Sequence, residues 1–191
     1  MHNTREDIIR LVEENDVEFI RLQFTDIFGT TKNMAVTTSQ LEKVLDNRET
    51  FDGSVIEGFV GYEKSELKLV PDLDTFTIFP WRPQSGKVAR LICDVTNYDG
   101  TPYGVASRNI LKKVMKQAQD MAFFFDVSPE CEFYLFDRTE NDEPTTYTRE
   151  RGNYFDIGPT DEGENARRDM VMTLEDMGFE IKSSYHEASP A

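Results

Sequence analysis

Cysteine is scarce in this chain, and its scarcity argues against two classes of protein. The 191 residues include only two cysteines, Cys93 and Cys131, and both lie within apolar stretches. Two cysteines at this separation make neither a disulfide framework nor a set of zinc ligands. We therefore interpret both as small, buried core residues.

Basic side chains and long apolar runs are also in short supply. The 21 lysines and arginines are outnumbered by 36 aspartates and glutamates, and the net charge of −15 repels nucleic acid phosphates and anionic membrane surfaces. The longest apolar runs fall well short of the roughly 18 residues that span a bilayer. The start of the chain lacks the basic and then apolar order of a signal peptide. We expect a globular cytoplasmic protein that binds neither nucleic acid nor membrane.

The first hundred residues carry the patterns of a small α+β domain. Thr4 and Asp7 resemble the N-cap and acidic first turn of a short amphipathic helix, and Ser39 is predicted to cap a second one. Pro71 and Asp72 are interpreted as breakers between two strands. The predicted strands cover residues 17–24, 30–36, 66–70, 75–79 and 88–95. Together these elements predict a mixed or antiparallel sheet.

A turn-rich stretch over residues 97–104 separates this region from a second one. We place the domain boundary there, so the predicted domains are 1–103 and 104–191. The elements predicted in the second domain are a helix over 107–122, a strand over 127–136, a polar loop over 137–152, a helix over 161–177 and a strand over 179–186.

Two glutamates in the predicted strand 127–136 are the most informative polar residues. Successive side chains of a strand alternate, so Glu130 and Glu132 are predicted to share one face. Like charges on one face need compensation, which Mg²⁺ or Mn²⁺ would supply through carboxylate oxygens while also holding the phosphates of a nucleotide. An exposed polar edge of a packed strand is the commoner interpretation of such a pattern.

Two further segments carry weaker signals. Glu187 follows His186 at the end of the last predicted strand and is a candidate third carboxylate, although a hydrogen-bonded structural histidine and a chance glutamate are the commoner interpretation. Asp52 with Gly53 and Ser54 has the signature of an ordinary turn, and the alternative is a loop that presents a carboxylate to a ligand. The residues alone indicate an α/β or α+β protein with a candidate acidic metal site.

Eight short segments form a recognisable series along the chain. They are RLQFTD at 21–26, FDGS at 51–54, PDL at 71–73, KVAR at 87–90, PECEF at 129–133, NYFD at 153–156, RRD at 167–169 and HE at 186–187. In this order they resemble bacterial class I glutamine synthetase from about residue 4 to residue 191. Any one segment could be a coincidence, but eight in register argue against chance.

The resemblance implies both a fold and an activity. The fold would be α+β, a β-grasp-like N-terminal domain followed by the start of a catalytic domain whose curved antiparallel sheet forms a site between neighbouring subunits. In the activity it implies, ATP phosphorylates the γ-carboxylate of glutamate, and ammonia then displaces phosphate to give glutamine. Two divalent cations, Mg²⁺ or Mn²⁺, would neutralise the transferring phosphoryl group. The complete protein would be a homo-oligomer, a dodecamer of two stacked hexameric rings.

By motif position, the resemblance also assigns roles to four carboxylates. Glu132 and Glu187 would bind the metal ion nearer to glutamate and ammonia, and Glu130 the metal ion nearer to the ATP phosphates. Asp52 would reach into the site of an adjacent subunit, where it would help to bind and deprotonate ammonium. Its negative charge suits a cationic substrate, especially where water is partly excluded.

Four positions depart from the family pattern. Val55 stands where a second serine is common, Gly61 where Firmicute-type relatives often have arginine, Lys182 where an acidic residue is usual, and Tyr185 where histidine is common.

Two alternatives therefore stay open beside the ligase. One is a γ-glutamyl ligase for an amine other than ammonia, and the other is a noncatalytic paralogue with a regulatory or assembly role. The remaining metal ligands and the arginines that bind glutamate would follow residue 191. We therefore expect the 191-residue piece alone to be inactive and prone to aggregate.

Overall fold

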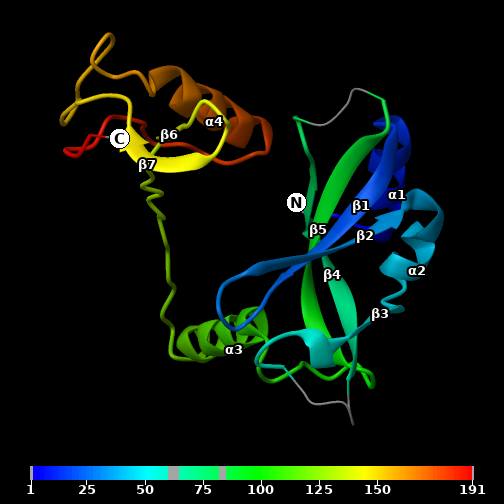
Figure 1. The fold of residues 1–191 in the computed structure, drawn as a ribbon. Helices are drawn as coiled ribbons and strands as arrows, with labels where there is room; N and C mark the ends of the chain where they lie inside the picture. The colour runs from blue at the N-terminus through cyan, green and yellow to red at the C-terminus, as the bar shows by residue number, and fades with distance from the viewer. Residues whose placement is uncertain (1, 60–64, 82–84, 191) are drawn as a thin grey trace. The chain divides into compact units, whose positions relative to one another are not determined.

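The computed structural model describes residues 2–59, 65–81 and 85–190, and the chain separates into two compact units, Met1–Asp126 and Val127–Ala191 (Figure 1). Helix α3 (Ser107–Asp120) belongs to the first of these units. The domain boundary at residues 103 and 104 stays a prediction from the sequence.

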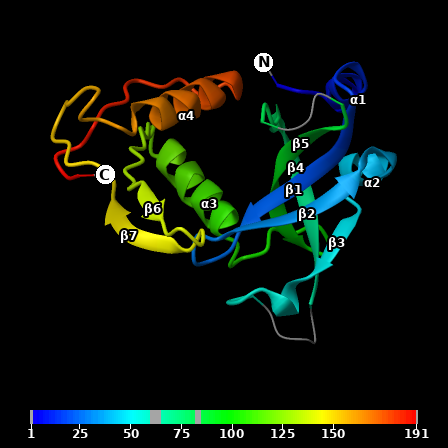
Figure 2. The same ribbon diagram turned by 45° about the horizontal axis from the view of Figure 1, so that its top comes forward.

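A five-stranded mixed sheet forms the centre of the first unit. Its strands, in the spatial order β2-β1-β5-β4-β3, are β1 (Val17–Thr25), β2 (Thr31–Thr37), β3 (Glu49–Asp52), β4 (Glu66–Ile78) and β5 (Lys87–Asn97). Strands β1 and β5 are parallel, whereas the other neighbours are antiparallel. Helices α1 (Arg5–Glu14) and α2 (Leu41–Leu45) lie on the same side of the sheet (Figure 2). The mixed sheet and the strands predicted at 17–24, 30–36 and 88–95 are confirmed.

The core follows from the alternation of side chains along the strands. In β1, Ile20, Leu22 and Phe24 are buried, while Arg21 and Gln23 point to the opposite face and are only half-buried. Burial of each large aliphatic or aromatic side chain stabilises the fold by about 1.5–3 kcal/mol. Residues from both helices and the other strands complete this core, among them Ile8, Val12, Leu41, Val44, Leu67, Leu69, Leu91 and Val95.

The two short helices begin in different ways. Thr4 caps α1 as predicted, because its hydroxyl accepts the Asp7 amide at 3.2 Å and the Asp7 carboxylate accepts the Thr4 amide at 3.0 Å. The predicted cap at Ser39 is wrong. A 3₁₀ turn, η1 (Thr38–Gln40), precedes α2, and the Ser39 hydroxyl lies 2.8 Å from the hydroxyl of Thr37.

Strand β4 continues through the two residues predicted to break it. Pro71 lies opposite Cys93 of β5, and the pairing of β3 with β4 covers only Glu66–Leu69. Pro71 therefore has a sheet neighbour on one side only, and an edge position tolerates the missing amide proton. The register shifts between Asp72 and Thr77, so the two predicted strands are one irregular strand.

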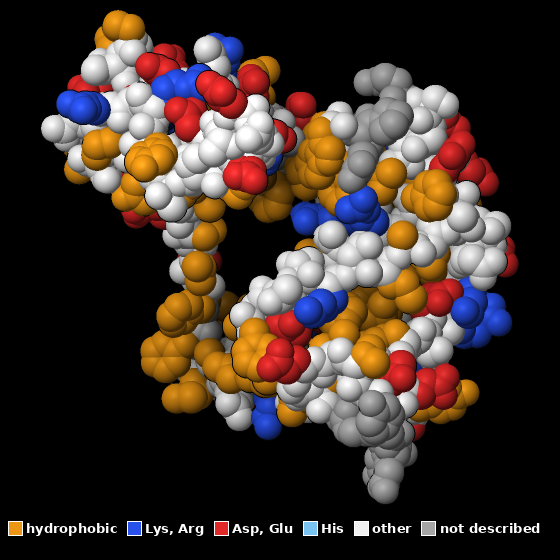
Figure 3. All heavy atoms as spheres, in the orientation of Figure 1, with side chains coloured by type: hydrophobic (Ala, Val, Ile, Leu, Met, Phe, Trp, Pro, Cys, Tyr) orange, Lys and Arg blue, Asp and Glu red, His pale blue; other side chains and the backbone are white. Residues whose placement is uncertain are grey.

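Helix α3 follows the predicted turn and is fixed to the sheet by polar contacts. Arg108 contacts Asp94 of β5 at 2.9 Å and also Asp72 of β4, and the side-chain amide of Asn109 donates to the carbonyl of Val95 at 2.6 Å. Its large apolar residues, by contrast, are exposed, and so are several in the segment after it (Figure 3). They are Ile110, Leu111, Val114, Met115, Met121, Phe123, Phe124 and Phe125.

The second unit contains an antiparallel pair, β6 (Phe136–Arg138) and β7 (Pro144–Thr148), and helix α4 (Glu164–Asp176). The helix confirms the prediction for 161–177. The strands predicted at 127–136 and 179–186 are wrong, since only Phe136 of these described residues belongs to a strand. A strand needs a neighbour for its backbone groups, and these two segments are joined by side chains instead. Within the described part of the chain, no helix is long and apolar enough to cross a membrane.

Candidate functional site

Tyrosine side chains join the two segments that carry the predicted metal carboxylates. The Tyr185 hydroxyl donates to Oε1 of Glu130 at 3.0 Å, and the Tyr134 hydroxyl donates to Oγ of Ser189 at 3.0 Å. Both hydrogen bonds connect residues that are 55 apart in the sequence. The segments are therefore joined at two points with the same offset, and at this offset Glu132 corresponds to Glu187.

The three predicted metal carboxylates are accessible but do not converge. Glu130 and Glu132 are exposed, and Glu187 is half-buried with its Oε2 accepting the Ala188 amide at 3.3 Å. Among the described side chains, the group able to surround one ion consists of other residues. The structure thus brings the two segments together without assembling the three glutamates, and their role as ligands stays a prediction.

Tyr185 is held in place by aromatic contacts as well as by Glu130. Its ring meets the rings of Tyr154 and Phe155 edge-on, with centroids 5.7 and 5.0 Å away. The hydrogen bond to Glu130 and the charge of that carboxylate raise the pKa of Tyr185 to about 12, since both disfavour the phenolate. Tyr185 is therefore a stable hydrogen-bond donor to Glu130.

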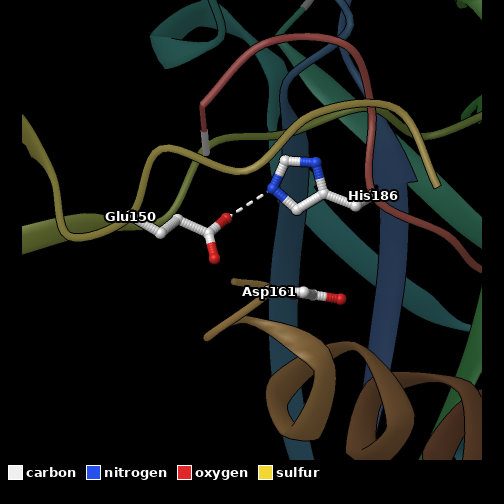
Figure 4. A group of neighbouring side chains, drawn as sticks. All are labelled: Glu150, Asp161 and His186. Atoms are coloured by element: carbon white, nitrogen blue, oxygen red, sulfur yellow. Dashed lines mark hydrogen bonds and ion pairs between the residues drawn. The ribbon is translucent and has the colours of Figure 1, made fainter. Parts of the chain in front are cut away.

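Glu150, Asp161 and His186 form a buried cluster in the second unit, and their ligand atoms lie within 4.8 Å of one another (Figure 4). Nε2 of His186 lies 2.5 Å from Oε1 of Glu150, and its Nδ1 lies 2.6 Å from the backbone carbonyl oxygen of Glu187. The sequence indicates His186 as a candidate but not Glu150. Glu150 follows β7, within the stretch 137–152 that the sequence predicts to be a polar loop. The burial of Glu150 leaves no signal in the sequence.

The surroundings of His186 favour its protonated form. A carbonyl oxygen can only accept, so Nδ1 carries a proton. Burial lowers the pKa of His186, but the hydrogen bonds to the Glu187 carbonyl and to Glu150, together with the charge of Glu150, outweigh burial and raise that pKa above its ordinary value. The structural interpretation of His186 fits these contacts.

Arg167 contacts the third residue of the cluster, Asp161. Its Nη1 donates to Oδ1 of Asp161 at 3.0 Å, and its Nη2 donates to the other oxygen of the same carboxylate. These hydrogen bonds hold the pKa of Asp161 below its ordinary value although burial opposes them. Arg167 thus pairs directly with one of the two carboxylates of the cluster.

Asp52 ends β3 in the first unit and is exposed. Its Oδ1 accepts the Ser54 hydroxyl at 2.6 Å and the Ser54 amide at 2.9 Å, and both contacts lower the pKa of Asp52. The predicted turn is confirmed, while the role of Asp52 toward ammonium stays a prediction. Val55 is 74% exposed beside it, and Gly61 lies outside the described residues.

The two cysteines have different environments. Cys93 is buried in β5, as predicted, and burial raises the pKa of its thiol to about 12. Cys131 is exposed, so its assignment to the core is wrong. The cause is the missing strand, because residues 127–135 are not packed into a sheet.

The fold of the first unit is of the β-grasp type, a mixed sheet with a parallel central pair and helices across one face. Residues 16–98 match the family profile described as the glutamine synthetase beta-Grasp domain, and residues 104–191 match that of the glutamine synthetase catalytic domain. The chain belongs to the glutamine synthetase family. The predicted α+β fold class with a β-grasp-like N-terminal part is therefore confirmed.

Curated relatives share more than half of the aligned residues. Glutamine synthetase of Clostridium saccharobutylicum is 59% identical over 186 residues, which cover 97% of this chain and 42% of that protein. Glutamine synthetase of Staphylococcus aureus is 56% identical over 188 residues, which cover 98% of this chain and 42% of that protein. This chain therefore spans about two fifths of the length of these relatives.

Solved structures with low sequence identity share the fold. Plasmodium falciparum glutamine synthetase aligns with a TM-score of 0.76 at 19% identity, over 98% of this chain and 43% of that chain. An ADP complex of GmaS aligns with the same TM-score of 0.76 at 18% identity, over 100% of this chain and 42% of that chain.

Proposed function

We propose that the complete protein is a glutamate-ammonia ligase, which uses ATP to join ammonia to the γ-carboxylate of glutamate through γ-glutamyl phosphate. The observation that carries this proposal is the match to both glutamine synthetase domains along the chain, together with 59% identity to a protein of that name. Because the chain spans 42% of that relative, the activity is assigned to a longer polypeptide that contains it.

The chain's carboxylates suit a hard divalent cation. Glu132 and Glu187 take equivalent positions on two joined segments, and Glu132 is exposed. Carboxylate oxygens are the ligands that Mg²⁺ and Mn²⁺ prefer, so we assign these two residues to one ion and Glu130 to the other. Such ions supply the electrostatic stabilisation that phosphoryl transfer from ATP requires.

The substrates and the assembly belong to the same proposal. The lowered pKa of Asp52 keeps its carboxylate ionised, which suits an ammonium ion. Glutamate and ATP would be the other substrates. The dodecamer of two stacked hexameric rings and the cytoplasmic location are proposed with them, on the basis of family membership alone.

The test is the formation of γ-glutamyl hydroxamate by the full-length protein from glutamate, ATP, hydroxylamine and Mn²⁺. We expect turnover at a rate typical of an enzyme, with median values of about 10 per second. Glu132→Gln, which removes a proposed metal ligand, should abolish most of it, whereas Glu175→Gln on the exposed side of α4 serves as the control. Absence of product from the unaltered protein would favour the noncatalytic paralogue.

Val55 supports a second candidate, a γ-glutamyl ligase for a different amine. It is an exposed apolar side chain three residues after Asp52, at a position where the family commonly has a hydroxyl. A site with Val55 in place of the hydroxyl would accommodate a larger and partly apolar amine better than ammonium. Competition between ammonia and a polyamine as acceptors separates the two, and a clear preference for the polyamine would replace the first proposal.

A further inference from the structure

The buried cluster of the second unit contacts the backbone of a proposed metal ligand, Glu187. His186 precedes Glu187, and its Nδ1 donates to the backbone carbonyl of Glu187 at 2.6 Å. Its Nε2 contacts Glu150 at 2.5 Å (Figure 4). Both nitrogens of the ring are therefore engaged. The ring therefore connects a buried carboxylate to the main chain that carries Glu187.

The surroundings of the ring restrict its rotation. Oε2 of Glu150 accepts the backbone amide of Glu162, which fixes the carboxylate from its other side. Gly152 packs against the imidazole so closely that a Cβ there would lie 2.5 Å from Nε2. The carbonyl of His186 itself accepts the Phe155 amide at 3.0 Å. The main chain at residues 186 and 187 is thus held by side-chain and backbone contacts together.

The same cluster has the composition of a metal site, but its contacts argue against one. Nε2 of His186 already shares a hydrogen bond with Glu150, and Arg167 contacts both oxygens of Asp161. Arg167 already supplies a positive charge to this cluster through Asp161. A metal ion there would have to displace these contacts and share the two carboxylates with Arg167, and buried charge without full compensation is costly away from water.

We propose that His186 and Glu150 are positioning residues that fix the main chain of Glu187 and so the direction of its carboxylate toward a divalent ion. This inference rests on the proposed function, in which Glu187 is a metal ligand. Groups behind a metal ligand commonly orient it, and their loss weakens metal binding about 10- to 100-fold. The contact of His186 to Glu187 runs through the backbone and uses neither carboxylate oxygen of Glu187; Oε1 has no hydrogen bond among the described residues, and Oε2 accepts the Ala188 amide at 3.3 Å.

The positioning role is tested by titrating the full-length protein with Mn²⁺ and measuring the free ion by electron paramagnetic resonance. Glu150→Ala should raise the Kd of one Mn²⁺ site by about 10-fold or more, since the imidazole loses its anchor. Glu150→Gln should restore binding to within about 3-fold of the unaltered protein, because its amide can still donate to a neutral Nε2. His186→Ala should match Glu150→Ala.

A buried carboxylate in the first unit provides the matched control. Asp26 is 2% exposed, accepts the amides of Phe28 and Thr30 at 2.9 Å, and pairs with Lys32 at 3.2 Å. Asp26→Ala should lower the midpoint of thermal unfolding, as Glu150→Ala does, and leave the Kd for Mn²⁺ unchanged.

Three results would overturn the positioning role. An unchanged Kd in Glu150→Ala, with a lowered thermal midpoint, would make the cluster merely structural. Loss of a whole equivalent of Mn²⁺ in Glu150→Ala but not in Glu187→Gln would place an ion in the cluster itself. Failure of the unaltered protein to bind Mn²⁺ would reject the proposed function as well, whereas the first two results leave that function standing.

Discussion

Two buried side chains of the second unit have pKa values that the fold shifts. His186 and Asp161 are both buried, and the partners of each shift its pKa in the direction that favours the charged form. Such groups link folding stability to pH. The sign of each shift fixes the pH range in which its contribution is present.

The stability from His186 should decrease as the pH rises. Its pKa is raised in the folded chain, so its contribution is complete below the ordinary value of 6.5 and is lost as the pH passes the higher folded value. Thermal midpoints of the full-length protein and of Glu150→Gln, measured from pH 5 to pH 9 in about unit steps, test this. The advantage of the unaltered protein over Glu150→Gln should shrink as the pH rises, and a constant difference would contradict the assignment.

Asp161 acts at the opposite end of the pH scale. Its pKa is lowered, so its contribution is complete above the ordinary value of 3.8 and is lost as the pH falls through the folded value. The cluster should therefore stabilise the second unit most between these two limits, in mildly acidic solution.

Gly152→Ala should destabilise the second unit. The new Cβ would lie 2.5 Å from Nε2 of His186, and a shift of the ring would disturb the hydrogen bonds of both its nitrogens. Overpacking of this kind costs about 1–3 kcal/mol. Gly104→Ala is the matched control, since nothing lies within 4 Å of a Cβ at that position. Equal thermal midpoints for the two variants would show that the pocket around His186 yields easily.

Whole elements depend on how their ends and faces are held. The capping box at Thr4 predicts that Thr4→Ala destabilises the first unit by about 1 kcal/mol, while Thr4→Ser keeps the hydroxyl and most of the stability. Denaturant unfolding of the full-length protein, monitored by amide hydrogen exchange in α1, measures the change in the free energy of unfolding. A loss in Thr4→Ser as large as that in Thr4→Ala would show that the hydroxyl is not the source.

Arg108 is the residue of α3 that contacts carboxylates on two strands. Arg108→Ala would leave Asp72 without this cation and Asp94 with Lys112 alone. Amide hydrogens of residues 107–120 should then exchange faster, because local opening costs less free energy. Lys116→Ala removes only an exposed ion pair with Asp120, which is worth about 0–1 kcal/mol, and should leave exchange nearly unchanged.

At the scale of the whole molecule, bound ions should link the proposed site to stability. Mn²⁺ at about 100 times its Kd should stabilise the full-length protein by about 2.7 kcal/mol, and a chelator should reverse the effect. Glu132→Gln should lose most of this thermal shift, whereas Glu175→Gln on α4 should keep it. A full shift in Glu132→Gln would remove Glu132 from the ligand set.

The sequence by itself determined the family and four elements of the first unit, β1, β2, β5 and α1, whereas β3 and the continuity of β4 were missed. Alternating apolar residues fix which face of each strand is buried, and the reciprocal contacts of Thr4 and Asp7 are local, so β1, β2, β5 and α1 follow from neighbouring residues alone. The eight motifs identified the family because they occur in one order along the chain. Pro71 was misjudged because only the sheet shows that β4 has a single neighbour at that point.

Only the tertiary structure determined which charged residues of the second unit are buried and paired. Glu150, Asp161 and His186 come from two loops and the last segment of the chain, and their burial depends on contacts that no local pattern encodes. The segments around Glu130 and Glu187 read as strands, yet two tyrosine hydrogen bonds join them instead of a backbone ladder. Burial and pairing depend on side chains that the fold brings together in space. The hydrophobic periodicity of a sequence depends only on residues that are close along the chain.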